Sequence, residues 1–382
     1  MLRSIFWFII ISMTGLSCQS EMRNVEDPPS PEALLEEDTS NKVRARIREV
    51  AASKDQWTGV TVSAGGRMFV NFPRWDSPHD LSVAELVDDQ PQPYPDASTN
   101  SWSGNPMAQD AFICVQSVVA DGNGHLWVLD PANPQFSGVV AGGARLHRID
   151  LNTDQITRTY FFPDSIAPRS SYLNDLRVDT VERVAYITDS GLGALVVVDL
   201  QSGAMRRVLD QHPSTQATLA GFEVGNYKWE AEIHSDGIAL APDRKTLFYH
   251  ALSGHTLYAV PTELIRDFSI SSTELSAHVT EVAQTAPTDG MVFDQKGNLY
   301  LGALTENAVC RLSALGRLDT LIADDRIRWA DTFTRGPNDA IYFTTSQIHI
   351  PPEARAPYKI FELIYPVPDE ESIEAAQYPE DI

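Results

Sequence analysis

The sequence predicts an all-β protein, a six-bladed β-propeller with four strands per blade, and three observations support this fold class. A hairpin pattern recurs six times, a weaker strand pair follows each copy, and no linker-like stretch interrupts residues 57–365. Four-stranded units repeated about four to eight times are typical of propellers. Radial closure also avoids the accumulated twist and the exposed edges of a long flat sheet.

The hairpin is the most regular element of the sequence. Each copy begins with a polar residue, has an apolar residue two places on, turns through Gly, Asp or Asn, and then reaches an aromatic residue. Short alternating runs around such turns are strand pairs. The copies begin at Thr58, Gln116, Asn174, Asp236, Asp289 and Asp331. We expect the aromatic residues of the hairpins, such as Trp127 and Tyr186, to lie in the core.

The second strand pair of each unit is less regular. It is expected in residues 81–89, 144–162, 194–209, 255–264, 308–322 and 358–365. The strand-like residues 43–53 precede the first hairpin, and we expect them to close the ring by joining the last blade. The propeller is therefore predicted to span residues 43–365.

The segments outside the propeller have different compositions. Residues 1–18 carry one Arg, an apolar run too short to span a bilayer and then small residues, the layout of a secretory signal. This leader resembles a bacterial lipoprotein signal with Cys18 as the lipidated residue, although Gly15 stands where Leu is usual; cleavage by an ordinary signal peptidase is the alternative. Acidic residues 19–42 are predicted to form a flexible tether, and residues 366–382 an acidic surface tail. We expect an exported protein, in the periplasm or at the cell surface if Cys18 anchors it to the membrane, and otherwise secreted.

The charge and the cysteine content exclude some classes of function. The chain has a formal net charge of −23, which repels polyphosphate and argues against a nucleic-acid partner. Beyond the leader only Cys114 and Cys310 remain, too few for a disulfide framework. Both lie in apolar runs, which favours buried thiols, although an oxidising compartment would permit one disulfide between them.

The chain resembles the major royal jelly protein/yellow family, in its bacterial branch. The resemblance runs from about residue 45 to 365 and rests on segments such as TGVTVSAGGRMFVNFPRW (58–75), VQSVVADGNGHLWVLDP (115–131) and SDGIALAPDRKTLFYHALSGHTLYAVPT (235–262). It implies a six-bladed propeller that is secreted. The functions known in the family are diverse and include dopachrome-converting enzymes, pigment proteins, binders of biogenic amines and nutritive proteins, so the resemblance leaves open whether this chain is an enzyme.

Six polar residues are the first candidates for a site. If each hairpin begins an equivalent strand, its first residue lies at an equivalent place around the ring, near one mouth of the central channel. We therefore expect Thr58, Gln116, Asn174, Asp236, Asp289 and Asp331 to share that mouth. The alternative is that the Asp-Gly pairs at 236–237 and 289–290 only shape the entry to their strands.

A metal site is one interpretation of these residues, because carboxylate and amide oxygens suit a hard cation such as Ca²⁺. Without a cation, three convergent carboxylates would raise at least one pKa. The layout resembles the gluconolactonase-like propellers, in which Glu, Asn and Asp hold a divalent cation for hydrolysis, and this resemblance implies Asn174, Asp236 and Asp289 as ligands. The sequence departs from that pattern at Thr58, where the family has Glu.

Aromatic residues suggest what a ligand would be. Trp75, Tyr94 and Trp229 fall in expected loops, where aromatic rings stack on planar or cationic groups; the alternative is that they pack between blades. Three functions remain open: binding of an amine or other aromatic metabolite at the channel mouth, a cation-dependent lactonase-like hydrolase, and a cell-surface interaction scaffold.

Overall fold

A computed structural model describes residues 45–76, 81–104 and 111–365. The predicted leader (1–18) with Cys18, the tether (19–42) and the tail (366–382) lie outside the described residues. In the part that is described, no helix is both long and apolar enough to cross a membrane.

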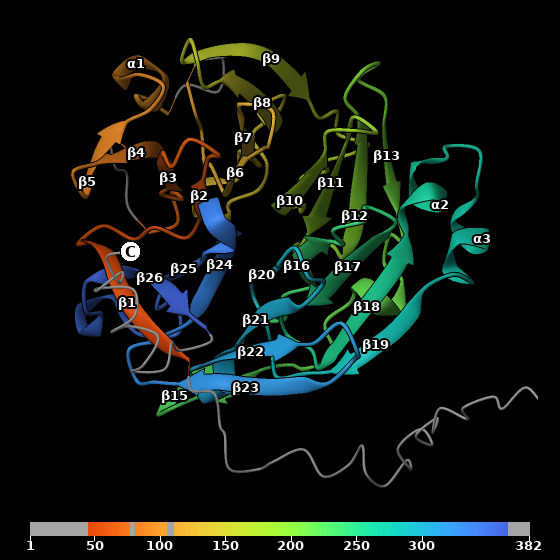
Figure 1. The fold of residues 1–382 in the computed structure, drawn as a ribbon. Helices are drawn as coiled ribbons and strands as arrows, with labels where there is room; N and C mark the ends of the chain where they lie inside the picture. Colours follow the sequence, from red (N-terminus) through yellow and green to blue (C-terminus); the bar gives the residue numbers. More distant parts are fainter. Residues whose placement is uncertain (1–44, 77–80, 105–110, 366–382) are drawn as a thin grey trace, which may run out of the picture. The chain divides into compact units, whose positions relative to one another are not determined.

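Six four-stranded antiparallel sheets surround a central channel, which confirms the predicted six-bladed propeller (Figure 1). In the first three blades the strands follow chain order from the channel outward. Blade 1 contains β2 (Val60–Val62), β3 (Met68–Asn71), β4 (Val83–Val87) and β5 (Gln90–Pro93). Blade 2 contains β6 (Ser117–Ala120), β7 (His125–Asp130), β8 (Arg145–Asp150) and β9 (Gln155–Phe161). Blade 3 contains β10 (Leu173–Asp179), β11 (Val184–Asp189), β12 (Ala194–Asp199) and β13 (Met205–Val208).

The last three blades complete the ring. Blade 4 contains β16 (Ser235–Leu240), β17 (Thr246–Ala251), β18 (Thr256–Pro261) and β19 (Thr280–Gln284). Blade 5 contains β20 (Met291–Phe293), β21 (Leu299–Ala303), β22 (Ala308–Leu312) and β23 (Leu318–Ala323). Blade 6 contains β24 (Ala330–Arg335), β25 (Ile341–Thr345), β26 (Tyr358–Ile364) and, outermost, β1 (Arg46–Ser53). The expected closure is confirmed, because β1 pairs with β26 from Arg46↔Ile364 to Ser53↔Tyr358.

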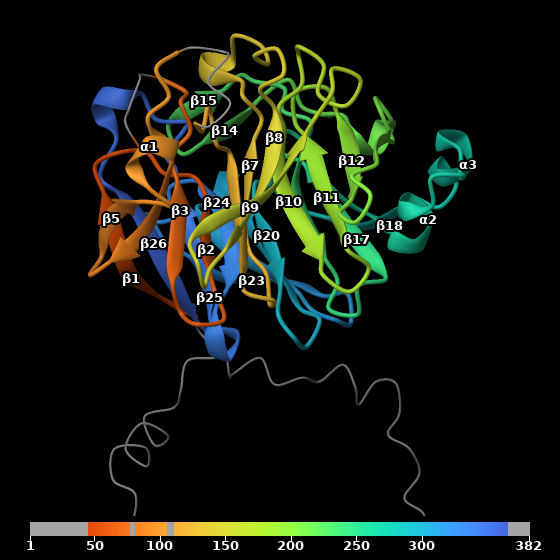
Figure 2. The same cartoon turned by 90° about the horizontal axis from the view of Figure 1, so that it is seen from above.

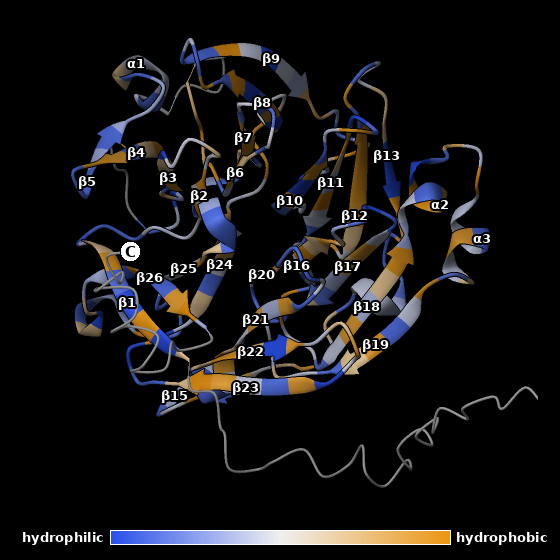
Figure 3. Ribbon diagram, viewed as in Figure 1, coloured by the Kyte–Doolittle hydropathy of each residue, from blue (hydrophilic) through white to orange (hydrophobic). Residues whose placement is uncertain are grey.

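The core lies between neighbouring blades, where the apolar faces of adjacent sheets meet. Trp127 and Ile187 pack between blades 2 and 3, and Tyr186 packs with Tyr249 between blades 3 and 4. The hairpin aromatics Trp127 and Tyr186 are therefore core residues, as predicted. Figure 3 shows apolar residues gathered on the blade strands, most clearly on β12. Cys114 and Cys310 are both buried free thiols, in agreement with the simpler expectation.

Elements outside the blades are short. In the described part of the chain they include the hairpin β14 (Phe222–Val224)–β15 (Tyr227–Trp229), the helices α1 (Ala97–Asn100), α2 (Thr262–Arg266) and α3 (Ser272–Ser276), and several single-turn 3-10 helices. Figure 2 shows the β14–β15 hairpin at one end of the propeller, above the inner strands. This hairpin was not predicted from the sequence, although aromatic residues flank a Gly-Asn turn at 225–226.

Candidate ligand-binding site

A cavity of about 290 Å³ lies at the channel end where the inner strands begin. Most of the predicted site residues line it: Trp75, Gln116, Asn174, Trp229, Asp236, Asp289 and Asp331. Loops supply further lining residues that the sequence analysis did not identify: Gln56, Asp76, Phe136, Tyr172, Ser190, Gly191, Glu232, Ile233, Leu252, Ile348 and Arg355.

Thr58 and Tyr94 lie away from this cavity, and both have structural partners. The Thr58 hydroxyl accepts a hydrogen bond from Asn71 Nδ2 at 3.0 Å, and its carbonyl accepts one from the Thr344 hydroxyl. Tyr94 packs on Phe69 with ring centroids 4.8 Å apart. Its hydroxyl donates to Asp154 at 2.8 Å. The structure therefore places these two residues in the packing of blade 1.

Glycine and strand bulges bring the carboxylates together. A Cβ at Gly237 would lie 2.2 Å from the carbonyl oxygen of Asp289, and one at Gly290 would lie 1.9 Å from that of Asp331. Only glycine permits so close an approach of neighbouring inner strands. The pairing of β16 is irregular between Ser235 and Ile238, a bulge that re-aims the side chain of Asp236. The Asp-Gly pair at 236–237 thus lies within β16 and the pair at 289–290 directly precedes β20, and both lie at close backbone contacts between neighbouring blades.

The three carboxylates at the base of the cavity are almost completely buried. The exposed fractions of Asp236, Asp289 and Asp331 are 2%, 9% and 5%. Burial raises the pKa of Asp236 well above its usual range, and the charges of Asp289 and Asp331 raise it further. Burial also raises the pKa of Asp331, with a further contribution from the charge of Asp289. Like charges that share a buried site disfavour the simultaneous ionisation of all three carboxylates.

Asp289 is the carboxylate most easily ionised of the three. Burial raises its pKa to about 6, and side-chain hydrogen bonds with Trp329 and Asp236 limit this rise. The Trp329 Nε1–H donates to Asp289 Oδ2 at 2.7 Å. Trp329 itself is held in an aromatic cluster with Trp229, Phe222 and His349, at centroid distances of 4.9, 6.0 and 5.4 Å. Near neutral pH the base of the cavity thus carries a negative charge on Asp289.

A relay of hydrogen bonds crosses four blades and ends at the carboxylates. Trp75 Nε1 donates to the Tyr172 hydroxyl at 2.6 Å, and that hydroxyl donates to Gln116 Oε1 at 2.8 Å. Gln116 Nε2 donates to Asn174 Oδ1 at 3.1 Å, and Asn174 Nδ2 donates to Asp236 Oδ2 at 2.6 Å. Each donor of the relay is used within the protein. Carboxylate oxygens therefore remain as acceptors for a ligand, together with a donor outside the relay, Trp229 Nε1, which has no hydrogen-bond partner in the described part of the chain.

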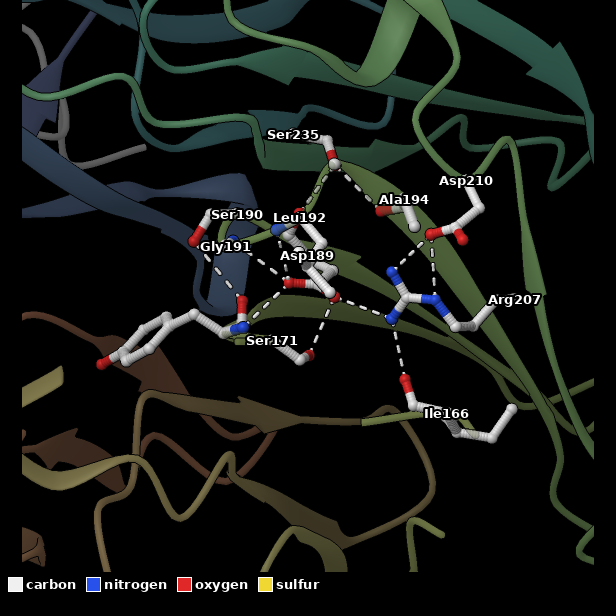
Figure 4. A network of polar contacts seen from close by, with 12 residues as sticks. Ile166, Ser171, Asp189, Ser190, Gly191, Leu192, Ala194, Arg207, Asp210 and Ser235 are labelled. Carbon is white, nitrogen blue, oxygen red and sulfur yellow. Dashed lines mark hydrogen bonds and ion pairs between the residues drawn. The ribbon is translucent and has the colours of Figure 1, made fainter. Parts of the chain in front are cut away.

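The Asp189 carboxylate positions two of the loops that form the cavity wall (Figure 4). Asp189 Oδ1 accepts from the backbone N–H groups of Tyr172 at 2.8 Å and Gly191 at 3.1 Å. Asp189 Oδ2 accepts from the Ser171 hydroxyl at 2.8 Å and from Arg207 Nη1 at 2.7 Å. Because Asp189 terminates β11, this network ties both loops to the rigid sheet of blade 3.

Aromatic rings form one wall of the cavity. Phe136 lies between Trp75 and Tyr172, with centroid distances of 5.8 and 5.2 Å. At the rim, the Arg355 guanidinium lies 3.2 Å from the Asp76 carboxylate. Glu232 adds a further acid to the lining. Acidic side chains thus outnumber the single Arg around the cavity.

The predicted metal ligands fit a cation poorly as they are arranged. Within the described ranges, no group of three or more His, Cys, Asp or Glu side chains is placed to hold a metal ion. The Asn174 amide turns its nitrogen toward Asp236, since its oxygen accepts from Gln116. A metal-ligating amide uses its oxygen. The set Asn174, Asp236 and Asp289 therefore presents an amide N–H at a place where a Ca²⁺ ion would need an oxygen.

Comparison with known proteins agrees with the fold. The sequence model of the family described as major royal jelly protein matches residues 113–318. The chain belongs to the major royal jelly protein family. Among curated members, it is 24% identical to major royal jelly protein 5 of Apis mellifera over 67% of this chain and 43% of that protein. It is 25% identical to protein yellow of Drosophila yakuba over 69% of this chain and 53% of that protein. The chain thus spans about half the length of these family members.

Solved structures of other propellers resemble this family member in fold alone. A gluconolactonase from Xanthomonas campestris aligns with a TM-score of 0.54 at 14% identity, covering 84% of this chain and 91% of that one. Regucalcin from Agrobacterium tumefaciens, described as a calcium-binding protein, aligns with a TM-score of 0.51 at 12% identity, covering 82% of this chain and 93% of that one. At such low sequence identities the similarity shows a shared arrangement of blades and does not indicate a shared reaction or ligand.

Proposed function

We propose that this chain is an exported propeller that binds a small aromatic amine in the cavity lined by Asp236, Asp289 and Asp331. The observation that carries the proposal is a cluster of three buried carboxylates beneath an aromatic wall. Export is supported by the signal-like layout of residues 1–18. Lipid attachment at Cys18 belongs to the same proposal.

The charge of the site selects a cation. A buried carboxylate is costly unless it is paired, so an ammonium group beside Asp289 relieves the desolvation of that carboxylate. The donors of the relay from Trp75 to Asp236 are used internally, and the carboxylate oxygens of the site remain as acceptors for the N–H groups of an ammonium. An anionic ligand would meet Asp76, Glu232 and Asp289 with only Arg355 to balance them.

The walls and the size of the cavity select a planar ring. A volume of about 290 Å³ lies just below the range of about 300–1,000 Å³ for small-molecule sites, and favours a single-ring ligand. Trp75, Phe136 and Tyr172 offer ring faces and edges on one side. Such rings attract both an aromatic ligand and its cationic group. A monoamine with one aromatic ring satisfies the charge, the volume and the wall together.

Calorimetric titration with dopamine and with catechol tests the proposal. These compounds share a ring, and only dopamine carries an ammonium group. We expect dopamine to bind at least tenfold more tightly than catechol, and Asp289→Asn to remove most of that difference. The matched control Asp164→Asn changes an exposed carboxylate and should leave both affinities unchanged. Equal binding of the two compounds, or a dopamine affinity that Asp289→Asn leaves intact, contradicts the proposal.

The same protein sample distinguishes the two other hypotheses. A lactonase-like hydrolase would contain a divalent cation, lose thermal stability with EDTA and hydrolyse a panel of lactones. A surface scaffold would bind neither dopamine nor lactones and would instead retain a protein partner in a pull-down experiment.

A further inference from the structure

A second cavity, of about 410 Å³, lies at the opposite end of the central channel. All six inner strands or the turns that follow them line it: β2, β6, β10, β16, β20 and β24. Its volume falls within the range of about 300–1,000 Å³ typical of small-molecule sites. None of the candidate ligand-binding residues at the other end belongs to it.

A polar bridge between blades separates the two cavities. Arg177 on β10 reaches across the channel and donates from Nη2 to the carbonyl of Met291 on β20 at 2.8 Å. Its Nη1 donates to Asp175 Oδ2 at 2.8 Å, and Asp175 Oδ1 accepts from the Ser117 hydroxyl of β6 at 2.8 Å. The bridge thus connects blades 2, 3 and 5 in the middle of the channel. A ligand in the second cavity is therefore held apart from the Asp236–Asp289 pair.

The charged groups of the second cavity are mainly cationic, in contrast to the overall charge of −23. Arg177, Arg244 and Arg335 line it, with Asp121 as the acid among the lining residues. The Asp121 carboxylate is already engaged, because it accepts from the backbone N–H groups of Asn123 and His125 and from Trp127 Nε1. Its oxygens are therefore occupied by protein donors, and its single negative charge is outnumbered by the three arginines.

The two outer arginines are available to a ligand. Arg244 approaches Asp179 only at 3.7 Å through Nε, and Arg335 approaches Asp339 at 3.4 Å. The side chains of Arg244 and Arg335 are 46% and 38% exposed. The Arg335–Asp339 pair is exposed on both sides and contributes little to stability, so a ligand carboxylate can compete for Arg335. Asp179 is buried, but its separation of 3.7 Å from Arg244 Nε is longer than a hydrogen bond, so the Arg244 guanidinium still has donors for a ligand.

The floor of the cavity is apolar. Val118, Val178, Leu240, Val292 and Phe333 contribute to it. A fully polar anion such as phosphate would lose hydrating water at the floor without gaining hydrogen bonds from its apolar side chains. A carboxylate has two oxygens that match the guanidinium fork, and its hydrocarbon body can occupy the apolar floor.

We propose that this second cavity binds a small carboxylate with an apolar body, its carboxylate between Arg244 and Arg335 and its hydrocarbon chain on the floor beneath. The site is independent of the amine site at the other end of the channel. We therefore expect the protein to bind a cationic and an anionic ligand at the same time, on opposite sides of the Arg177 bridge.

Calorimetric titration of the full chain with octanoate, 1-octanol, acetate and inorganic phosphate tests this inference. We expect octanoate to bind at least tenfold more tightly than each of the other three probes, because only octanoate has both the charge and the hydrocarbon chain. Arg244→Gln and Arg335→Gln should each weaken octanoate binding about three- to tenfold. The control Arg148→Gln, on β8 of blade 2, should have no effect.

The outcomes separate this site from the amine site. Asp289→Asn should leave the octanoate affinity unchanged, whatever it does to dopamine. The inference is overturned if octanoate does not bind in the millimolar range, if 1-octanol or phosphate binds as tightly as octanoate, or if both arginine variants retain the affinity of the unmodified chain.

Discussion

Asp289→Asn should make the protein more stable at neutral pH, because burial disfavours the ionised form of Asp289. Its pKa rises from 3.8 to about 6 on folding. The folded protein therefore binds this proton more tightly than the unfolded chain does. Stability falls as pH rises through the window from about 4 to about 6, and it stays lower above that window.

The magnitude follows from the shift in pKa. A change from 3.8 to about 6 corresponds to a cost of about 3 kcal/mol once Asp289 is ionised. An amide at this position removes that cost while its oxygen can still accept from Trp329 Nε1. It also removes a charge that raises the pKa of Asp236, which acts in the same direction. We therefore expect a gain of about 3 kcal/mol at pH 7.5 and almost none at pH 4.

Guanidinium chloride unfolding at the two pH values measures this difference, with tryptophan fluorescence as the signal. Asp164→Asn serves as the control, because Asp164 is exposed and should change stability little at either pH. A destabilised Asp289→Asn protein at pH 7.5, or an equal gain at both pH values, would refute the account of the buried carboxylates.

Four further predictions follow from the same structure. Trp329→Phe removes the N–H donor to Asp289 and should raise the pH at which dopamine binding is half lost, as read from titrations between pH 5 and 8. Tyr172→Phe leaves Trp75 Nε1 and Gln116 Oε1 without their partner in the relay. The substitution should lower the free energy of unfolding by about 1–3 kcal/mol and weaken dopamine binding. Unchanged stability and unchanged dopamine affinity would show that the relay is unimportant. Asp130→Ala removes the acceptor for the buried N–H groups of Ile113, Cys114 and Ala132 and should cost at least about 3 kcal/mol in denaturant unfolding, whereas Asp130→Asn should cost less. Deletion of residues 1–53 should abolish a single cooperative thermal transition, whereas deletion of residues 1–44, which keeps β1, should preserve it.

The fold could be predicted because propeller blades are local. Each hairpin turns within its own segment, so the alternation around residues such as Trp127 and Tyr186 reports the pairing directly. The number of copies then gives the number of blades. Convergence of Gln116, Asn174, Asp236, Asp289 and Asp331 on one cavity follows from the same equivalence.

The rest of the site could not be predicted, because it depends on how loops meet across the ring. Tyr172 and Phe136 belong to different stretches of chain, and only the closed ring places them in contact. Thr58 begins its hairpin like the other copies, yet Asn71 Nδ2 binds its hydroxyl and keeps it out of the cavity. Tyr94 looked like a loop aromatic, but it packs on Phe69 within blade 1. Local patterns contain no information about these contacts.

The pairing of β1 with β26 has a consequence for how the molecule is made. Arg48 on β1 and its ion-pair partner Glu362 on β26 are 314 positions apart. During synthesis β1 therefore cannot pair with β26 until nearly the whole chain has been made. Contacts of such long range are slow to form. Until then the sixth sheet lacks its outermost strand and the ring of blades is not closed.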